Sequence, residues 1–100
     1  MTFNDLKFER HQSFPMFMTQ AKVELSNGNG LSVVNGEYAY CNDETYEIAP
    51  LLNGELFYVD NWGDQVKGYV TPDEITKILT AAELMSPEKY KEFLEEFFNR

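Results

Sequence analysis

The hydrophobic pattern of this 100-residue protein changes its period once, close to residue 71. Before that point, apolar and polar residues alternate in short runs separated by Asn-Gly pairs, as in residues 21–25. Alternation with one polar face is typical of antiparallel strands, and Asn-Gly supplies the positive φ angles that tight hairpins need. After residue 71 the apolar residues recur at helical spacing. Strands followed by helices, in a protein of this length, predict an α+β fold in a single domain, residues 1–100.

The part before residue 71 predicts four antiparallel strands within residues 14–59. The expected strands cover residues 14–25, 31–40, 46–52 and 55–59. Asn35-Gly36 is expected to bend or bulge the second strand without ending it. In the third, Pro50 predicts an edge position or a bulge, because proline has no N–H to donate to a neighbouring strand. Short turns between the strands give a four-stranded antiparallel meander.

Residues 71–99 are expected to form two C-terminal helices. Thr71-Pro72-Asp73-Glu74 combines an N-cap threonine, a proline at the first helical position and a glutamate three residues after the cap. These are the signals of a helix start, and Ser86-Pro87 repeats the cap and the proline. Each start precedes apolar residues at i, i+3, i+4 and i+7, which predicts one buried stripe per helix. The stripes are Ile75, Ile78, Leu79 and Ala82, then Tyr90, Phe93, Leu94 and Phe97.

We expect at least the first helix to pack across one face of the sheet. The second stripe, with Phe98 beside it, has two interpretations. It is core if the last helix folds back onto the sheet, and a surface for a partner or a second copy if it does not. We favour core.

The net charge of −9 is unevenly distributed. Residues 41–64 contain six acidic residues and no lysine or arginine, and so carry six of the nine net negative charges. An excess of acid argues against direct nucleic-acid binding, which needs a basic surface. It favours instead a host protein with a basic surface as the partner.

Five of these acidic residues are expected to form one acidic edge of the sheet, with a tryptophan at its centre. Ile48 belongs inside, so Glu47 should point to solvent beside the turn at residues 43–44. The backbone should return to this end after the fourth strand, and Trp62 is then the expected anchor because aromatic residues are enriched at interface centres. The alternatives are a merely solvated acidic face and a turn that seats the tryptophan. The predicted partner-binding residues are Asp43, Glu44, Glu47, Asp60, Trp62 and Asp64.

The sequence offers little catalytic chemistry. Its one cysteine, Cys41, has acidic neighbours that disfavour a thiolate, and its one histidine, His11, lies in a polar stretch. A calcium loop starting at Asp60 fails because Trp62 takes a ligand position, and no phosphate-binding glycine motif occurs. We therefore expect no catalytic residue, no cofactor and no metal, and hence no enzyme.

Membrane association is not expected either. No apolar run approaches the roughly 20 residues of a membrane helix, and the first residues do not form a secretory signal. These observations predict a cytoplasmic monomer or homodimer with no membrane partner.

A series of short motifs runs through about residues 20–82. The motifs are Asn29-Gly30, Ser32-Val33-Val34 with Gly36, Tyr38-Ala39-Tyr40, Tyr46-Glu47-Ile48-Ala49, Asn53-Gly54-Glu55-Leu56 and Asp64-Gln65-Val66-Lys67-Gly68-Tyr69-Val70-Thr71-Pro72-Asp73-Glu74-Ile75. In this series the protein resembles a widespread group of short, uncharacterised proteins of phages, prophages and mobile elements. The group has no assigned biochemistry, so the resemblance implies an origin rather than an activity. Residues 41–44 and 86–100 depart from its pattern, and a specialised function would lie there.

Three functions follow as expectations. The first is a non-catalytic protein-interaction module, encoded by a phage or mobile element, that binds and inhibits a host protein. The second is an acidic nucleic-acid mimic, of the anti-CRISPR or anti-restriction type, that blocks a DNA- or RNA-handling enzyme. The third is a small enzyme or binding protein based on Asp and Glu residues.

Overall fold

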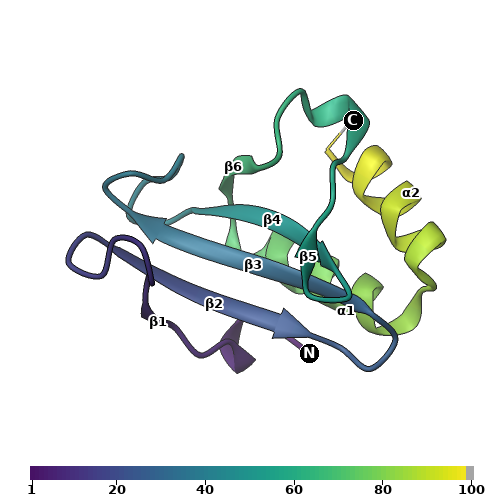
Figure 1. Cartoon of the computed structure of the whole chain (residues 1–100). Coiled ribbons are helices and arrows are strands. Elements are labelled where there is room, and N and C mark those ends of the chain that lie inside the picture. Colours follow the sequence, from purple (N-terminus) through teal and green to yellow (C-terminus); the bar gives the residue numbers. More distant parts are fainter. Residues whose placement is uncertain (99–100) are drawn as a thin grey trace.

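The computed structural model describes residues 1–98 and confirms the α+β class: an antiparallel sheet is followed by two C-terminal helices (Figure 1). Short 3-10 helices lie before and within the sheet region. In sequence order the elements are η1 (Phe3–Asp5), β1 (Glu9–Arg10), β2 (Met18–Glu24), β3 (Asn29–Gly36), β4 (Tyr46–Leu52), β5 (Glu55–Leu56), η2 (Asp60–Trp62), β6 (Lys67–Val70), α1 (Pro72–Leu84) and α2 (Pro87–Phe97). Residue 99, the end of the expected helical part, lies outside the described residues.

The meander has five strands in the order β1-β2-β3-β4-β5, and β6 pairs with β4, so the sheet has six strands rather than four. Every pairing is antiparallel. The expected strands within residues 14–59 correspond to β2 to β5. The two additional strands are short, and each is defined by its pairing with a longer strand. β1 contributes two residues opposite β2, and β6 joins β4 across an intervening hairpin.

Three expected strand boundaries were wrong. Residues 14–17 form a turn, so the first long strand begins at Met18. The next strand ends at Gly36 instead of continuing to residue 40, because Gly36 has φ +145° and the backbone turns away there. The strand expected at 55–59 is limited to Glu55 and Leu56.

Pro50 lies in a central strand, not at an edge. β4 pairs with β3 along one side. On the other side, β6 pairs with Tyr46 and Ile48, and β5 pairs with Leu51 and Leu52. Pro50 falls between these two partner strands, at a position where its nitrogen does not need to donate a hydrogen bond to a neighbouring strand. The irregularity of β4 is not at Pro50 either, because the register shifts between Tyr46 and Ile48.

Both helix starts are confirmed. The Thr71 side chain accepts a hydrogen bond from the Glu74 N–H, and the Ser86 side chain accepts one from the Lys89 N–H. The α1 stripe is buried, and α2 also folds back, with Tyr90, Leu94 and Phe97 in the hydrophobic core. The stripe of α2 is therefore core, as we favoured.

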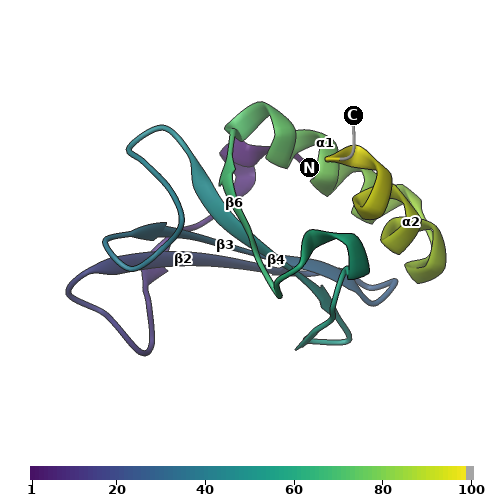
Figure 2. The same ribbon diagram turned by 90° about the horizontal axis from the view of Figure 1, so that it is seen from above.

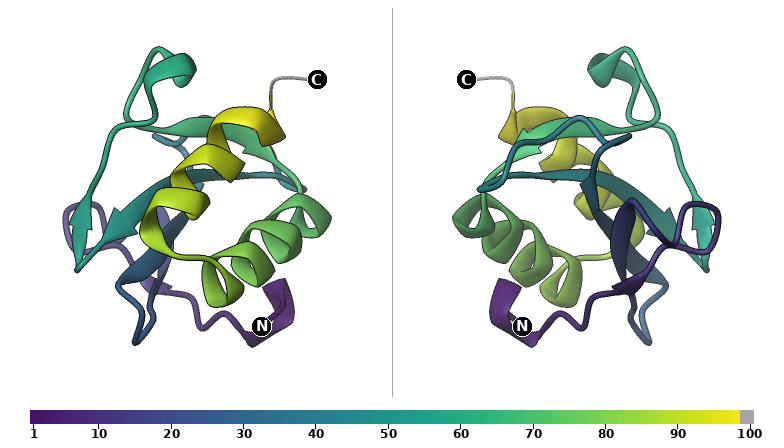
Figure 3. Two further views of the ribbon diagram at one scale, coloured as in Figure 1. Left: turned by 90° about the vertical axis from the view of Figure 1, so that its right-hand side faces the viewer. Right: turned by 90° about the vertical axis from the view of Figure 1, so that its left-hand side faces the viewer.

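The two helices form a layer over one face of the sheet, and η1 lies next to α1 (Figures 2 and 3). The core between the layers includes Val33 of β3 and Ile48 of β4, which are directly opposite each other in the register. Neither helix is long and apolar enough to span a bilayer within the described part of the protein.

Candidate interaction surface

Exposed apolar side chains gather at one end of the sheet. Ten large hydrophobic residues of the described part are exposed, and half of them lie in two connections, residues 11–17 and 37–45. These connections meet because the start of β2 pairs with the end of β3, Met18 opposite Gly36. We call the group at this end the tip surface. It consists of His11, Phe14, Met16, Phe17 and Tyr38.

The rings of the tip surface contact one another. Tyr38 has its ring centroid 5.2 Å from that of Phe14 and 5.5 Å from that of Phe17, and His11 is 5.9 Å from Phe14. Yet Tyr38 remains 60% exposed and Met16 83% exposed. The rings are therefore ordered by mutual contact while staying open to solvent.

Backbone hydrogen bonds hold the 11–17 connection in shape. The N–H groups of Phe17 and Met18 both donate to the carbonyl of Phe14, at 3.1 and 3.0 Å, and the His11 N–H donates to the carbonyl of Met18 at 3.0 Å. The His11 ring is also engaged, since its Nδ1 accepts from the Ser13 N–H at 3.0 Å. A connection fixed in this way presents its side chains without a large ordering cost on binding.

Gly36 allows the two connections to meet. Its φ of +145° is a conformation that L residues with a side chain rarely adopt, and a Cβ at this position would lie 2.3 Å from the Phe17 carbonyl oxygen. The next residue, Glu37, donates its N–H to that same oxygen at 3.1 Å. The absence of a side chain at residue 36 thus brings Tyr38 against Phe17.

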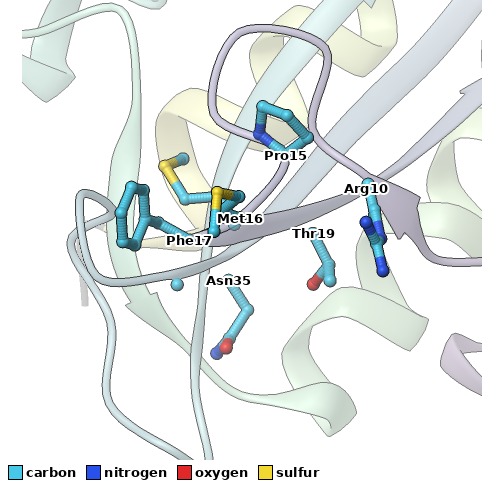
Figure 4. Close-up of a pocket in the computed structure, with 8 residues that line it drawn as sticks. Arg10, Pro15, Met16, Phe17, Thr19 and Asn35 are labelled. Atoms are coloured by element: carbon cyan, nitrogen blue, oxygen red, sulfur yellow. The ribbon is translucent and has the colours of Figure 1, made fainter.

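Beside the tip surface lies an open depression of about 450 Å³, which we call the tip pocket. In Figure 4, Arg10, Thr19 and Asn35 extend toward the same side. This agrees with the register, because Arg10 pairs with Thr19 and Thr19 pairs with Asn35. Pro15, Met16 and Phe17 supply an apolar wall. The pocket is completed by Met18 and Gly36.

A second depression, of about 320 Å³, shares Phe17, Asn35 and Gly36 with the tip pocket but is otherwise different. Its remaining lining residues are Glu37, Cys41, Asn42 and Asp43. Cys41 is half-buried, with its Sγ 3.7 Å from the Gly36 carbonyl oxygen. Phe17 therefore lies between a depression that contains a cation, Arg10, and one that contains two carboxylates.

Three of the residues predicted for partner binding lie near the tip surface. Asp43 and Glu44 are exposed in the 37–45 connection, which is ordered by a hydrogen bond of 2.9 Å from the Glu44 N–H to the Asn42 side chain. Glu47 is half-buried on β4, and its Oε2 accepts from the Tyr40 N–H at 2.7 Å. Among residues 1–98, none of these three carboxylates forms an ion pair.

The other three predicted residues lie elsewhere, around η2 next to α2 (Figure 1). Trp62 is half-buried: its Nε1–H donates to the Leu94 carbonyl at 3.4 Å, and its ring packs against Phe98. Asp60 and Asp64 are exposed on either side of it. The backbone leaves β5 after two residues and crosses to α2, so the six residues form two groups, and Trp62 seats a turn on the helix.

Sequence reasoning missed the aromatic and methionine residues of the tip surface, and Arg10. The run Phe14-Pro15-Met16-Phe17-Met18 and the Tyr38-Ala39-Tyr40 motif are apolar enough to look like buried strand ends. A proline inside the first run and a glycine before the second are the signals of non-strand structure that were available.

No group of three or more His, Cys, Asp or Glu residues suited to a metal ion occurs within residues 1–98. No protein-family model matches the sequence, and no curated protein or solved structure is significantly similar to this protein.

Proposed function

We propose that this protein is a non-catalytic interaction module that binds another protein through the tip surface and inhibits it by covering part of its surface. The observation that carries the proposal is the exposed cluster of three aromatic residues and Met16, built from two connections that contact each other. Aromatic residues and methionine are enriched at the centres of protein interfaces. Contiguous apolar patches on small proteins are commonly binding sites.

The burial of α2 strengthens this choice of surface. Its aromatic stripe was the other candidate for docking, and Tyr90, Leu94 and Phe97 are occupied in the protein's own core. The exposed rings of the tip surface have no comparable role, because Phe14, Phe17 and Tyr38 belong neither to the hydrophobic core nor to the residues packed against it within the described part of the protein.

The acidic residues next to the tip surface define a further property of the partner. Glu37, Asp43 and Glu44 are exposed, and none of them pairs with a cation in residues 1–98. Such a rim attracts a basic partner and raises its association rate at low salt. The proposal includes a host protein as the partner, the cytoplasm as the setting and a phage or mobile element as the origin. The last of these rests on the resemblance of residues 20–82.

No observation on the described residues favours the other two functions. A nucleic-acid mimic needs carboxylates spaced along one surface like phosphates, whereas the predicted acids fall into two groups. An enzyme based on Asp and Glu needs carboxylates that converge in a pocket, and the acidic residues here line an open depression or lie apart.

The test is affinity capture from the lysate of a candidate bacterial host, followed by purification of the captured protein and measurement of its affinity. The tip variant Phe17→Ala/Tyr38→Ala is compared with the control variant Tyr58→Ala/Leu84→Ala, which removes exposed apolar side chains away from the tip surface. The tip variant should lose at least about tenfold in affinity, since aromatic interface anchors often contribute more than 1 kcal/mol each. The control should bind as the unmodified protein does. Equal affinities of the two variants would place the binding site elsewhere.

A further inference from the structure

Arg10 is a cation without an ion-pair partner among residues 1–98 of an acidic protein. Within residues 1–98 its guanidinium takes part in no ion pair and no side-chain hydrogen bond, although the protein has a net charge of −9. An arginine fork has five donors and no acceptor, and it matches the geometry of a carboxylate. Its natural ligand is therefore an anion with two acceptor oxygens.

The neighbours of Arg10 extend this polar side of the tip pocket. Arg10, Thr19 and Asn35 lie in register on three adjacent strands, so their side chains share one face (Figure 4). Asn35 is anchored, because its Nδ2 donates to the carbonyls of Asn42 and Thr45 at 3.2 and 2.9 Å. The Thr19 hydroxyl has no partner among the described residues. An anion on Arg10 thus meets a second available donor.

The opposite wall of the tip pocket is apolar. Pro15, Met16 and Phe17 form it, and the volume of about 450 Å³ is sufficient for an amino-acid side chain beside the anion. Methionine adapts well to irregular apolar shapes. The pocket is suited to an anion and an apolar group together.

The second depression, on the other side of Phe17, determines which way round a ligand with both an acidic and a basic group binds. Glu37 and Asp43 line it on the other side of Phe17, and they would repel an anion. A partner therefore gains by placing its carboxylate at Arg10 and its basic residues at Asp43. With the basic residues at Arg10 and the carboxylate at Asp43, like charges would meet on both sides of Phe17, which disfavours that orientation.

We infer that the tip pocket binds an internal Asp or Glu of the partner, flanked by an apolar residue, with the carboxylate on Arg10. This rests on the proposed function, because it specifies what the partner presents to the tip surface. The carboxylate of an Asp or Glu side group fits better than that of a polypeptide terminus, since terminal carboxylates are captured by nests of backbone N–H groups. The donors facing this pocket are side chains.

The test uses three capped tripeptides as probes: Leu-Asp-Leu, its neutral isostere Leu-Asn-Leu and the basic Leu-Lys-Leu. Each is titrated into the ¹⁵N-labelled protein. Leu-Asp-Leu should shift the signals of Thr19 and of the Asn35 side-chain amide in a saturable way. It should bind at least about threefold more tightly than the other two peptides, which is the size of effect that a solvent-exposed ion pair gives.

The variant Arg10→Gln should weaken Leu-Asp-Leu binding by the same factor. Lys22→Gln is the matched control: Lys22 is an exposed, unpaired cation on β2, within the described residues, but it does not line the tip pocket. Unchanged dispersion of the amide spectrum establishes that both variants are folded. Equal binding of Leu-Asp-Leu and Leu-Asn-Leu, an unaffected Arg10→Gln variant, or shifts that map outside the tip pocket would each overturn the inference.

The two proposals fail in different ways. If the peptide binds as expected but Phe17→Ala/Tyr38→Ala retains full affinity for the purified partner protein, the tip pocket's preference for a carboxylate beside an apolar group stands, but the proposed function, and with it the assignment of that carboxylate to the partner, does not. If that variant loses the partner while the peptides show no preference for the carboxylate, the proposed function stands and the inference is wrong.

Discussion

The Tyr90 hydroxyl donates a buried hydrogen bond of 2.9 Å to the carbonyl oxygen of Gly30, joining α2 to β3. Both residues are buried, and a Cβ at residue 30 would lie 2.3 Å from the Val23 carbonyl oxygen. Because the hydroxyl needs a partner at a defined point of the sheet, the bond sets where α2 lies along β3. Together with the burial of Leu94 and Phe97, this contact makes the aromatic stripe of α2 part of the protein's own core.

Replacing Tyr90 by phenylalanine should lower the free energy of unfolding by about 1 kcal/mol, the net contribution of a typical intramolecular hydrogen bond. Urea denaturation at neutral pH measures the change. Phe93→Leu serves as a control, because that side chain lies on the same helix and is only half-buried. A smaller loss for Tyr90→Phe than for Phe93→Leu would contradict the role given to the hydroxyl.

The effect of Tyr90 should also depend on pH. Burial raises the pKa of the Tyr90 phenol, because it penalises the charged form. The folded protein then retains this proton at pH values where the unfolded state, with a tyrosine pKa of about 10, releases it. Stability from Tyr90 is thus fully present below about pH 10 and falls above it, by up to about 1.4 kcal/mol per pH unit. The stability of the unmodified protein relative to Tyr90→Phe should decrease between about pH 9 and pH 11, as urea denaturation across that range would measure.

The C-terminal carbonyls of α1 are capped from the β2–β3 hairpin. The Nδ2 groups of Asn27 and Asn29 both donate to the carbonyls of Ala82 and Met85, at 2.8 to 3.2 Å. Asn29 is buried and Asn27 is exposed. Asn29→Asp should therefore cost roughly 3 kcal/mol or more, because it sets a buried carboxylate against two carbonyl oxygens. Asn27→Asp, which solvent screens, should cost about 1 kcal/mol or less. Equal losses in thermal or urea denaturation would contradict this assignment.

Gly36 should be needed for both stability and the tip surface. Gly36→Ala introduces a Cβ 2.3 Å from the Phe17 carbonyl oxygen at a φ of +145°, so the two connections must separate. Gly63→Ala is the matched control, since Gly63 also has a positive φ, +71°, but no atom within 4 Å of an added Cβ. The control should cost about 1 kcal/mol from backbone strain alone, and Gly36→Ala clearly more. Amide spectra should show shifts at Phe17 and Tyr38 only in Gly36→Ala.

The features that the sequence predicted correctly are those fixed by local interactions. Thr71 and Ser86 start the two helices through hydrogen bonds to residues three positions away. Asn53 and Gly54 form the turn of the β4–β5 hairpin with φ values of +52° and +84°. In each case the residues that decide the structure lie within a few positions of one another.

The features that sequence reasoning missed depend on contacts between distant residues. β1 and β6 form because β2 and β4 offer free edges for pairing. These strands have only two and four residues, too few to show a strand pattern in the sequence. Phe14 and Phe17 look like strand residues by type, but the turn before Met18 leaves them outside the core. The predicted acidic edge assumed that the backbone returns along β4 after residue 56, whereas the half-buried Trp62 takes it to α2.

The division of the acidic residues gives a test of where the partner binds. Asp43→Lys/Glu44→Lys and Asp60→Lys/Asp64→Lys change the net charge by the same amount, and all four carboxylates are exposed and free of ion pairs within residues 1–98. Only the first pair adjoins the tip surface. If binding takes place there, the first variant should lose affinity for the purified partner and show a slower association at low salt, because nearby charges steer encounter. The second variant should retain most of its affinity at a salt concentration near about 0.15 M, where screening limits the reach of charges to about 8 Å.

Association rates measured at two salt concentrations separate the alternatives. Equal losses in both variants would support the nucleic-acid mimic over the tip surface, and no loss in either would show that the acidic residues are only solvated.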